Sequence, residues 1–312
     1  MKAFVAGTRG SALALWQTRK VISLLNARTQ GKPPITERII TTQGDTSLAE
    51  RLVGQLEKGF FTQELEAALN DNSIQLAVHS LKDLPTRMPQ GLVLGAVLER
   101  ASPFDMLLVR PEAVAASGAI PLAAGARIGS SSLRRGAQLE RFAPGTSSLP
   151  LRGNVPTRVE KLRAGQYDGI LIAAAGIQRL ELSMEGIAVY RLDPRLWCPA
   201  PGQGAVAVQC REDDTDTRAL LGLIHHAETA RAVSIERDLL WVFEGGCSTP
   251  FGCYVEGQTV WVGLLAHGRW RAAKWTVPEV DSKPDWEQLL GALSAPDYVE
   301  KMDVIDPICT RL

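Results

Sequence analysis

Residues 74–85 read Ile-Gln-Leu-Ala-Val-His-Ser-Leu-Lys-Asp-Leu-Pro, an apolar run that stops at a Lys-Asp pair and a proline. A short apolar run bounded in this way predicts a β-strand. In α/β folds, ligands bind in the crevice outside the carboxyl ends of such strands. The stretch therefore predicts an α/β strand that presents Lys82 and Asp83 to a cleft. A plain surface turn is the alternative interpretation.

The same alternation of short apolar runs and helical patterns continues along the first two thirds of the chain. It covers residues 3–6, 11–26, 36–41, 61–70 and 76–78, and then residues 106–109, 127–129, 132–141, 148–151, 156–164 and 169–173. This is the β-α-β rhythm of a largely parallel sheet covered by helices, so we expect two α/β units in series. A strand-like run at 205–209 follows a Pro- and Gly-rich connection. Its return to one of the sheets would make the first domain discontinuous.

The pattern changes near residue 229. One amphipathic helix extends to about residue 243 and is stopped by Gly245-Gly246, and strand-like runs follow at 254–265 and 269–277, with a helix at 286–293. We therefore expect a small C-terminal α+β domain. The predicted domains are 1–102 with 199–222, then 103–198, and finally 223–312.

Composition narrows the class of protein. The 312 residues include 34 Lys plus Arg and 34 Asp plus Glu, so no bulk charge points to nucleic acid or a membrane surface. Five cysteines without a Cys-x-x-Cys spacing and only four histidines favour neither a disulfide framework nor a metal site. No apolar stretch reaches the roughly 20 residues of a membrane span, and no signal peptide is visible. We expect a soluble, cytoplasmic monomer.

Three segments share one design, in which a strand ends, small or hydroxyl residues make a turn, and an arginine lies at the turn or in the first turn of the next helix. They are residues 7–11, 129–135 and 152–158. Each offers a Ser or Asn as a helix cap. Cations in a first helical turn oppose the helix dipole unless an anion intervenes. Several such sites predict a ligand with several carboxylates, which guanidinium groups bind in bidentate pairs. Solvation, or pairing with Glu140 and Glu160, is the alternative.

Two further segments are candidates for function. Cys247 follows the Gly-Gly helix stop, where a thiol would stand at a domain edge, although a free cysteine is more often a small buried residue. Lys58-Gly59-Phe60-Phe61 precedes a helix and predicts a mobile lid, with a purely structural role for the rings as the alternative. The chain has no nucleotide-binding glycine loop that would favour a phosphate ligand.

Taken together, six motifs in collinear order resemble the porphobilinogen deaminases, also called hydroxymethylbilane synthases. The motifs are Thr-Arg-Gly-Ser-Ala-Leu-Ala-Leu-Trp-Gln at 8–17, His-Ser-Leu-Lys-Asp-Leu-Pro at 79–85, Ser-Ser-Leu-Arg-Arg at 131–135, Arg-Gly-Asn at 152–154, Pro-Gly-Gln-Gly at 201–204 and Glu-Gly-Gly-Cys at 244–247. The resemblance extends from residue 4 to residue 255 and thins beyond Cys253.

The resemblance implies three α/β domains, the first two shaped like the doubly wound lobes of periplasmic-type binding proteins. It implies a transferase of haem-type tetrapyrrole biosynthesis that polymerises porphobilinogen into the linear tetrapyrrole hydroxymethylbilane and releases ammonia. One dipyrromethane cofactor per chain would be held by a thioether to Cys247, and Asp83 matches the catalytic aspartate. Loss of ammonia leaves a cationic azafulvene, and a fixed carboxylate is suited to stabilise such a charge.

The remaining site residues are also implied by the resemblance. The positions that match cofactor binding are Lys82, Asp83, Ser131, Ser132, Arg134, Arg135, Arg152 and Gly153. Those that match substrate binding are Arg9, Ser11, Arg152, Arg158, Arg179 and Gln203, with Lys58 and Phe61 in the lid loop and no metal. Two other hypotheses stay open at this point: a two-lobed receptor that binds a polycarboxylate without chemistry, and a transferase for a phosphorylated substrate.

Overall fold

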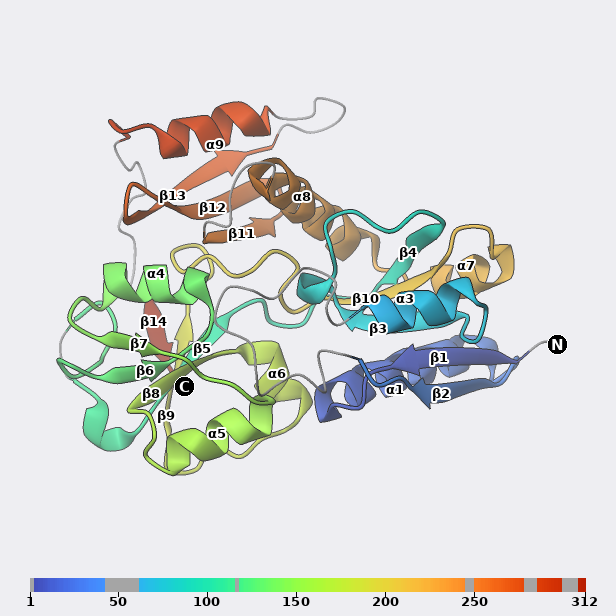
Figure 1. The fold of residues 1–312 in the computed structure, drawn as a ribbon, viewed down its shortest axis with the longest axis horizontal. Coiled ribbons are helices and arrows are strands. Elements are labelled where there is room, and N and C mark those ends of the chain that lie inside the picture. The colour runs from blue at the N-terminus through green and yellow to red at the C-terminus, as the bar shows by residue number, and fades with distance from the viewer. Residues whose placement is uncertain (1–2, 43–61, 116–117, 245–249, 278–284, 299–307) are drawn as a thin grey trace. The chain divides into compact units, whose positions relative to one another are not determined.

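The structure, a computed structural model, describes residues 3–42, 62–115, 118–244, 250–277, 285–298 and 308–312 (Figure 1). The chain divides into two compact units. The first unit comprises Met1–Ala101 and Gly202–Ser234, and the second comprises Ser102–Pro201 and Ile235–Leu312. Among the described residues, no helix combines the length and apolar character that crossing a bilayer requires.

The first unit contains a five-stranded mixed sheet. Its strands are β1 (Phe4–Thr8), β2 (Ile35–Ile39), β3 (Leu76–Ser80), β4 (Leu92–Val97) and β10 (Val206–Arg211), in the order β2-β1-β3-β10-β4. β1 is parallel to β2 and β3, whereas β10 is antiparallel to both β3 and β4. The strand-like run predicted at 205–209 therefore does return to the first sheet, and this unit is built from two separate stretches of chain.

The helices of the first unit pack on this sheet through apolar side chains. They are α1 (Ala12–Thr29), α3 (Gln63–Asn70), the 3-10 turn η1 (Leu81–Asp83), α7 (Thr215–Gly222) and the start of α8 (Ala227–Glu244). Val21 and Leu25 of α1 are fully buried in the same apolar cluster as Leu76 and Val78 of β3. Gly95 of β4 must lack a side chain, because a Cβ there would come within 2.5 Å of Leu221 in α7.

The second unit contains a six-stranded mixed sheet. Its strands are β5 (Asp105–Val109), β6 (Arg127–Gly129), β7 (Ser147–Leu149), β8 (Gly169–Ala173), β9 (Ala188–Leu192) and β14 (Cys309–Arg311), in the order β14-β9-β5-β8-β6-β7. β6 is parallel to β7 and β8, but β5 is antiparallel to β8 and β9. The expectation of largely parallel sheets thus needs correction, because apolar periodicity locates strands without giving their direction.

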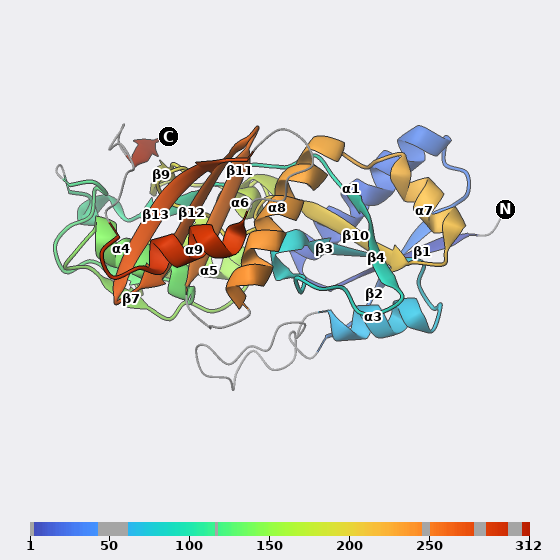
Figure 2. The same cartoon turned by 90° about the horizontal axis from the view of Figure 1, so that it is seen from above.

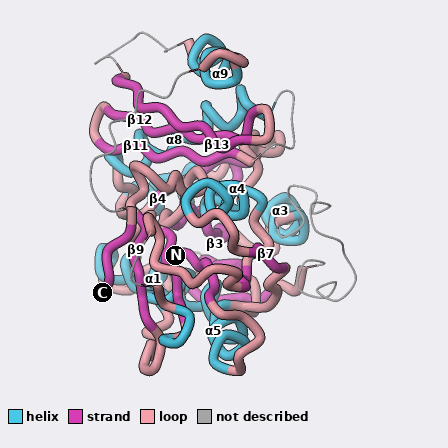
Figure 3. Tube along the Cα trace, turned by 90° about the vertical axis from the view of Figure 1, so that its left-hand side faces the viewer, coloured by secondary structure: helices cyan, strands magenta, loops and turns pink. Residues whose placement is uncertain are grey.

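Both faces of this second sheet are buried. The helical elements are η2 (Pro111–Ala113), α4 (Leu133–Phe142), α5 (Val155–Arg163) and α6 (Ala174–Arg179). Successive strand residues point to opposite faces, so Leu107 packs with Leu139 of α4, while Leu108 packs with Leu162 of α5. α4 and α5 accordingly cover opposite sides of the strands (Figures 1 and 3). This is the layered arrangement expected for a doubly wound α/β lobe.

The C-terminal part adds a small antiparallel sheet. It consists of β11 (Phe251–Glu256), β12 (Thr259–Ala266) and β13 (Arg269–Thr276), and α9 (Trp286–Ser294) packs on β12 and β13 (Figure 2). The run predicted as one strand at 254–265 is in fact a hairpin, broken at Gly257, whose φ of 58° suits glycine. The final strand, β14, pairs with β9. The predicted α/β class is confirmed, and the three-domain division stays a prediction.

Candidate functional site

Lys82 and Asp83 lie at the carboxyl end of β3, in the 3-10 turn η1. Both side chains are exposed, whereas Leu81 and Leu84 on either side of them are buried. The Leu81 N–H also donates to the oxygen of Ala205 at 3.0 Å, which ties the turn to the segment that enters β10. The segment is therefore a surface turn whose backbone is anchored by buried leucines on both sides of the two charged residues.

Gly202 and Gln203 of the Pro-Gly-Gln-Gly motif lie in the same unit as this turn and support it. Gly202 adopts a φ of +72°, and a Cβ there would come within 3.0 Å of the Leu81 side chain. Gln203, predicted to bind substrate, is only 1% exposed, and its backbone oxygen accepts a hydrogen bond from Arg100 Nε at 2.9 Å. Gly202 therefore packs against the turn that carries Asp83, which is a structural role.

His79, the residue before Ser80 in β3, is buried, and burial lowers its pKa from 6.5 to about 4. The nearby positive charge of Arg9 also lowers the pKa of His79. Its Nε2 has no hydrogen-bond partner among the described residues. The imidazole is therefore neutral at physiological pH and cannot supply a cation to the site.

His79 should make the free energy of unfolding depend on pH. Because its folded pKa is depressed, the unfolded chain binds more protons below pH 6.5, so stability is present above that pH and is lost as pH falls towards 4. We expect a loss of about 2 kcal/mol from this residue between pH 7.5 and 5.0. Urea unfolding at both values should show a smaller pH dependence in His79→Gln. The exposed His267→Gln is the control, and equal pH slopes in all three proteins would contradict this assignment.

All three predicted helix caps are confirmed. Ser11 accepts a hydrogen bond from Ala14 N–H at the start of α1, Ser132 from Arg135 N–H at the start of α4, and Asn154 from Thr157 N–H at the start of α5. The Oγ atoms of Ser11 and Ser132 thus already accept hydrogen bonds from backbone N–H groups. Arg134 and Arg135 do lie in the first turn of α4, as the sequence predicts.

The candidate residues of each unit gather at one edge of its sheet. Arg9 and Ser11 follow β1, and Lys82 and Asp83 follow β3, a strand parallel to β1. In the second unit, the candidates follow the parallel strands β6, β7 and β8; these residues are Ser131, Ser132, Arg134, Arg135, Arg152, Gly153, Arg158 and Arg179. The carboxyl ends of parallel strands share an edge, which is where α/β folds bind ligands.

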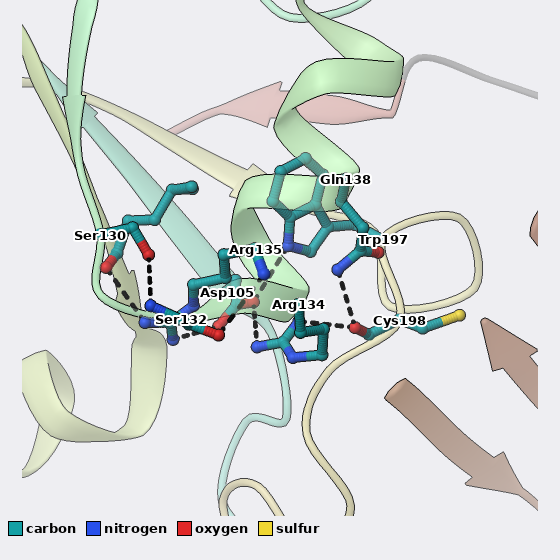
Figure 4. A network of polar contacts seen from close by, with 9 residues as sticks. Asp105, Ser130, Ser132, Arg134, Arg135, Gln138, Trp197 and Cys198 are labelled. Atoms are coloured by element: carbon teal, nitrogen blue, oxygen red, sulfur yellow. Dashed lines mark hydrogen bonds and ion pairs between the residues drawn. The ribbon is translucent and has the colours of Figure 1, made fainter. Parts of the chain in front are cut away.

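Arg134 and Arg135 are almost fully buried and share the carboxylate of Asp105 (Figure 4). Asp105 Oδ2 accepts from Arg134 Nη2 at 2.9 Å and from Trp197 Nε1 at 3.0 Å, while Oδ1 accepts from Arg135 Nη2 at 2.6 Å. The alternative that these arginines pair with Glu140 or Glu160 is wrong, since their carboxylate partner is Asp105. Sequence reasoning missed Asp105 as a site residue. The one signal that could have pointed to it is its position directly before the apolar run 106–109.

This cluster carries two cations and one anion in a buried setting. Burial lowers the pKa of Arg134, and the charge of Asp105 opposes that shift. Arg135 Nε is buried and has no hydrogen-bond partner among the described residues. A buried guanidinium N–H without an acceptor, next to a surplus positive charge, suits an anionic ligand such as a carboxylate. The residues present thus fit a group that carries carboxylates.

The other candidates of the second unit surround backbone turns. Ser131 Oγ donates to Leu151 O at 2.9 Å and accepts from Leu151 N–H at 3.0 Å. Arg158 Nε donates to the oxygen of Gly153 at 2.7 Å, and Gly153 adopts a φ of +113° that other residues rarely reach. Arg179 ends α6, and burial lowers its pKa to about 10, so it stays charged at neutral pH.

The described cysteines are poor nucleophiles. Cys198, Cys210 and Cys253 are fully buried, and burial raises the pKa of Cys210 to about 11. Cys309 is partly buried, and its pKa is raised for the same reason. Cys247 lies outside the described residues, as do Lys58 and Phe61.

Comparison with known proteins gives one consistent family. The family model "Porphobilinogen deaminase, dipyromethane cofactor binding domain" matches residues 4–219. The porphobilinogen deaminase of Desulforamulus reducens is 45% identical over 252 residues, covering 80% of this chain and 79% of that protein. That of Nitratidesulfovibrio vulgaris strain DP4 is 44% identical over 264 residues, covering 84% of this chain and 80% of that protein.

One solved structure shows a distant likeness to this chain. The probable amino-acid ABC transporter extracellular-binding protein ytmK from Bacillus subtilis is 10% identical, with a TM-score of 0.42, covering 79% of this chain and all of that one. A likeness at this level bears on neither ligand nor activity. The family model and the two relatives decide the assignment: this chain belongs to the porphobilinogen deaminase family.

Proposed function

We propose that the chain carries out the reaction of its family with Asp83 as its catalytic carboxylate and Cys247 as its cofactor anchor. It is a porphobilinogen deaminase of tetrapyrrole biosynthesis that works with a dipyrromethane cofactor. It releases ammonia from porphobilinogen and joins the pyrroles into hydroxymethylbilane. The observation that carries the proposal is the buried Arg134–Arg135 pair, whose two charges are met, among the described residues, by the one carboxylate of Asp105.

Cationic side chains would hold the cofactor and substrate through their acid groups. Each pyrrole ring carries an acetate and a propionate, so a site for several rings needs several cations. Arg134, Arg135 and Arg152 follow β6 and β7 and would hold cofactor carboxylates, together with Ser131, Ser132, Gly153 and Lys82. Arg9, Arg158 and Arg179, with Ser11 and Gln203, would serve the substrate. Guanidinium groups suit this role because they bind a planar carboxylate through two parallel hydrogen bonds.

Asp83 is suited to the chemical step by its placement on a fixed turn. Its carboxylate can accept hydrogen bonds from pyrrole N–H groups, and it stabilises the positive charge that develops when ammonia leaves. It can also accept the proton that is lost when the new ring becomes aromatic again. When bound, dipyrromethane supplies the pyrrole α-carbon to which the deaminated substrate is joined. The buried Leu81 and Leu84 hold the backbone of the turn that carries Asp83 in place, so little backbone reorganisation is needed during these steps.

The reaction itself tests the proposal. Purified protein from a cell that makes porphobilinogen should release ammonia from added porphobilinogen and form a linear tetrapyrrole. The denatured chain should weigh more than its sequence mass, because the cofactor is covalent. Binding of porphobilinogen without release of ammonia would favour a receptor instead. Strong competition by inorganic phosphate would favour a transferase for a phosphorylated substrate. We expect the enzyme to act as a cytoplasmic monomer.

A further inference from the structure

We propose that Asp105 is a positioning residue for the cofactor: it fixes both guanidinium groups of Arg134 and Arg135 before dipyrromethane binds. This inference rests on the proposed function and deepens it. Asp105 begins β5, is completely buried, and lies opposite Ala173 of β8 in the sheet register. It would not touch the substrate, and its effect would pass through the two arginines.

The geometry gives each carboxylate oxygen its own cation. Oδ1 accepts from Arg135 at 2.6 Å, and Oδ2 accepts from Arg134 at 2.9 Å and from Trp197 at 3.0 Å (Figure 4). The indole N–H of Trp197 occupies a lone pair and so fixes the rotation of the carboxylate. Without this shared anion, two like charges on adjacent residues of one helical turn would repel each other in a buried setting.

Backbone oxygens hold the far side of both guanidinium groups. Arg134 Nη1 donates to Cys198 O at 2.6 Å, and Arg135 Nη1 donates to Leu171 O at 3.1 Å. Gln138 Nε2 donates to the same Cys198 oxygen at 3.2 Å. All of these contacts form within the second unit and need no ligand. The arginines are therefore preorganised, which lowers the ordering cost of binding an anion.

The net charge of the Arg134–Arg135–Asp105 cluster defines what a bound anion would do. Two guanidinium groups and one carboxylate amount to a surplus of one positive charge, and Arg135 Nε still lacks an acceptor among the described residues. A buried charge is normally paired, because its desolvation is otherwise costly. One carboxylate of the cofactor would neutralise the surplus. Asp105 thus limits the surplus charge of the arginine pair to what a single ligand carboxylate can balance.

The test is the uptake of cofactor by the full-length chain. Wild-type and Asp105→Asn proteins would be produced in cells that cannot make porphobilinogen and then incubated with porphobilinogen. The gain in mass of the denatured chain would be followed over time and expressed per folded molecule, as judged by near-UV circular dichroism. We expect Asp105→Asn to take up cofactor about 30-fold more slowly, or more slowly still, because truncating one partner of a buried charge pair costs at least that much.

Two variants separate positioning from general stability. Asp168→Asn removes a carboxylate that pairs with the exposed Arg127 in the same unit, and it should load like the wild type. Asp105→Glu keeps the charge but moves it by one methylene, so its rate should lie between those of the wild type and Asp105→Asn. A folded Asp105→Asn that loads at the wild-type rate would overturn the inference. If Asp105→Asn does not fold, wild-type loading of Asp105→Glu would overturn it.

The outcomes also separate this inference from the proposed function. No mass gain in the wild-type protein would contradict the proposed covalent cofactor itself. A wild-type gain that Asp105→Asn matches would leave the reaction intact and reject only the role of Asp105.

Discussion

Replacing Asp83 with asparagine is expected to lower turnover by about 100- to 1,000-fold while the fold and the covalent cofactor are retained. The amide has the size of the carboxylate but no negative charge, so it cannot balance the cation that forms when ammonia leaves. Nor can it accept the proton released on rearomatisation. The side chain is exposed, and its neighbours Leu81 and Leu84 provide the packing, so the substitution should cost little stability.

Ammonia release at saturating porphobilinogen, together with the mass of the denatured chain, measures both parts of this expectation. Asp213→Asn is the matched control, because it removes another carboxylate of the first unit whose side chain is 88% exposed. Asp83→Glu should be impaired less than Asp83→Asn, since it keeps the charge at a displaced position. Near-normal product formation by Asp83→Asn would remove Asp83 from the catalytic role.

The parts of the site that depend on local sequence could be predicted. Ser11, Ser132 and Asn154 cap their helices as expected, because capping is decided by residues within three positions of a helix start. The place of Lys82 and Asp83 at a strand end also follows from a local pattern, an apolar run that stops at charged residues. Such features need no knowledge of distant partners.

The features that depend on distant partners could not be predicted. Asp105 lies 29 and 30 residues before the two arginines it binds, and 92 residues before Trp197. No periodicity links these positions. From the sequence alone, the two arginines are therefore interpreted as cations that need a ligand, whereas in the structure Asp105 neutralises part of their charge. Strand direction could not be predicted for the same reason. β5 and β14 run antiparallel to their neighbours because of the path by which the chain returns to the sheet, and a run of apolar residues does not encode that path.

Replacing Cys247 with serine is expected to abolish both the covalent cofactor and the activity. A thioether requires a sulfur nucleophile, and a serine hydroxyl is far less acidic and does not replace a thiolate. The denatured Cys247→Ser chain should therefore have its sequence mass of 33.8 kDa less the difference between sulfur and oxygen, even after incubation with porphobilinogen. Ammonia release should fall to the background rate, because no covalently held pyrrole remains to be extended.

Cys309→Ser is the informative control for this variant. Cys198, Cys210 and Cys253 are fully buried, so Cys309 is the most accessible thiol among the described cysteines. Its pKa is raised by burial, which lowers the thiolate fraction at neutral pH, so Cys309→Ser should still gain the cofactor mass and keep its turnover. An adduct that persists in Cys247→Ser but is lost in Cys309→Ser would move the anchor to the C-terminal strand. An adduct lost only in Cys247→Ser would establish Cys247 as the anchor.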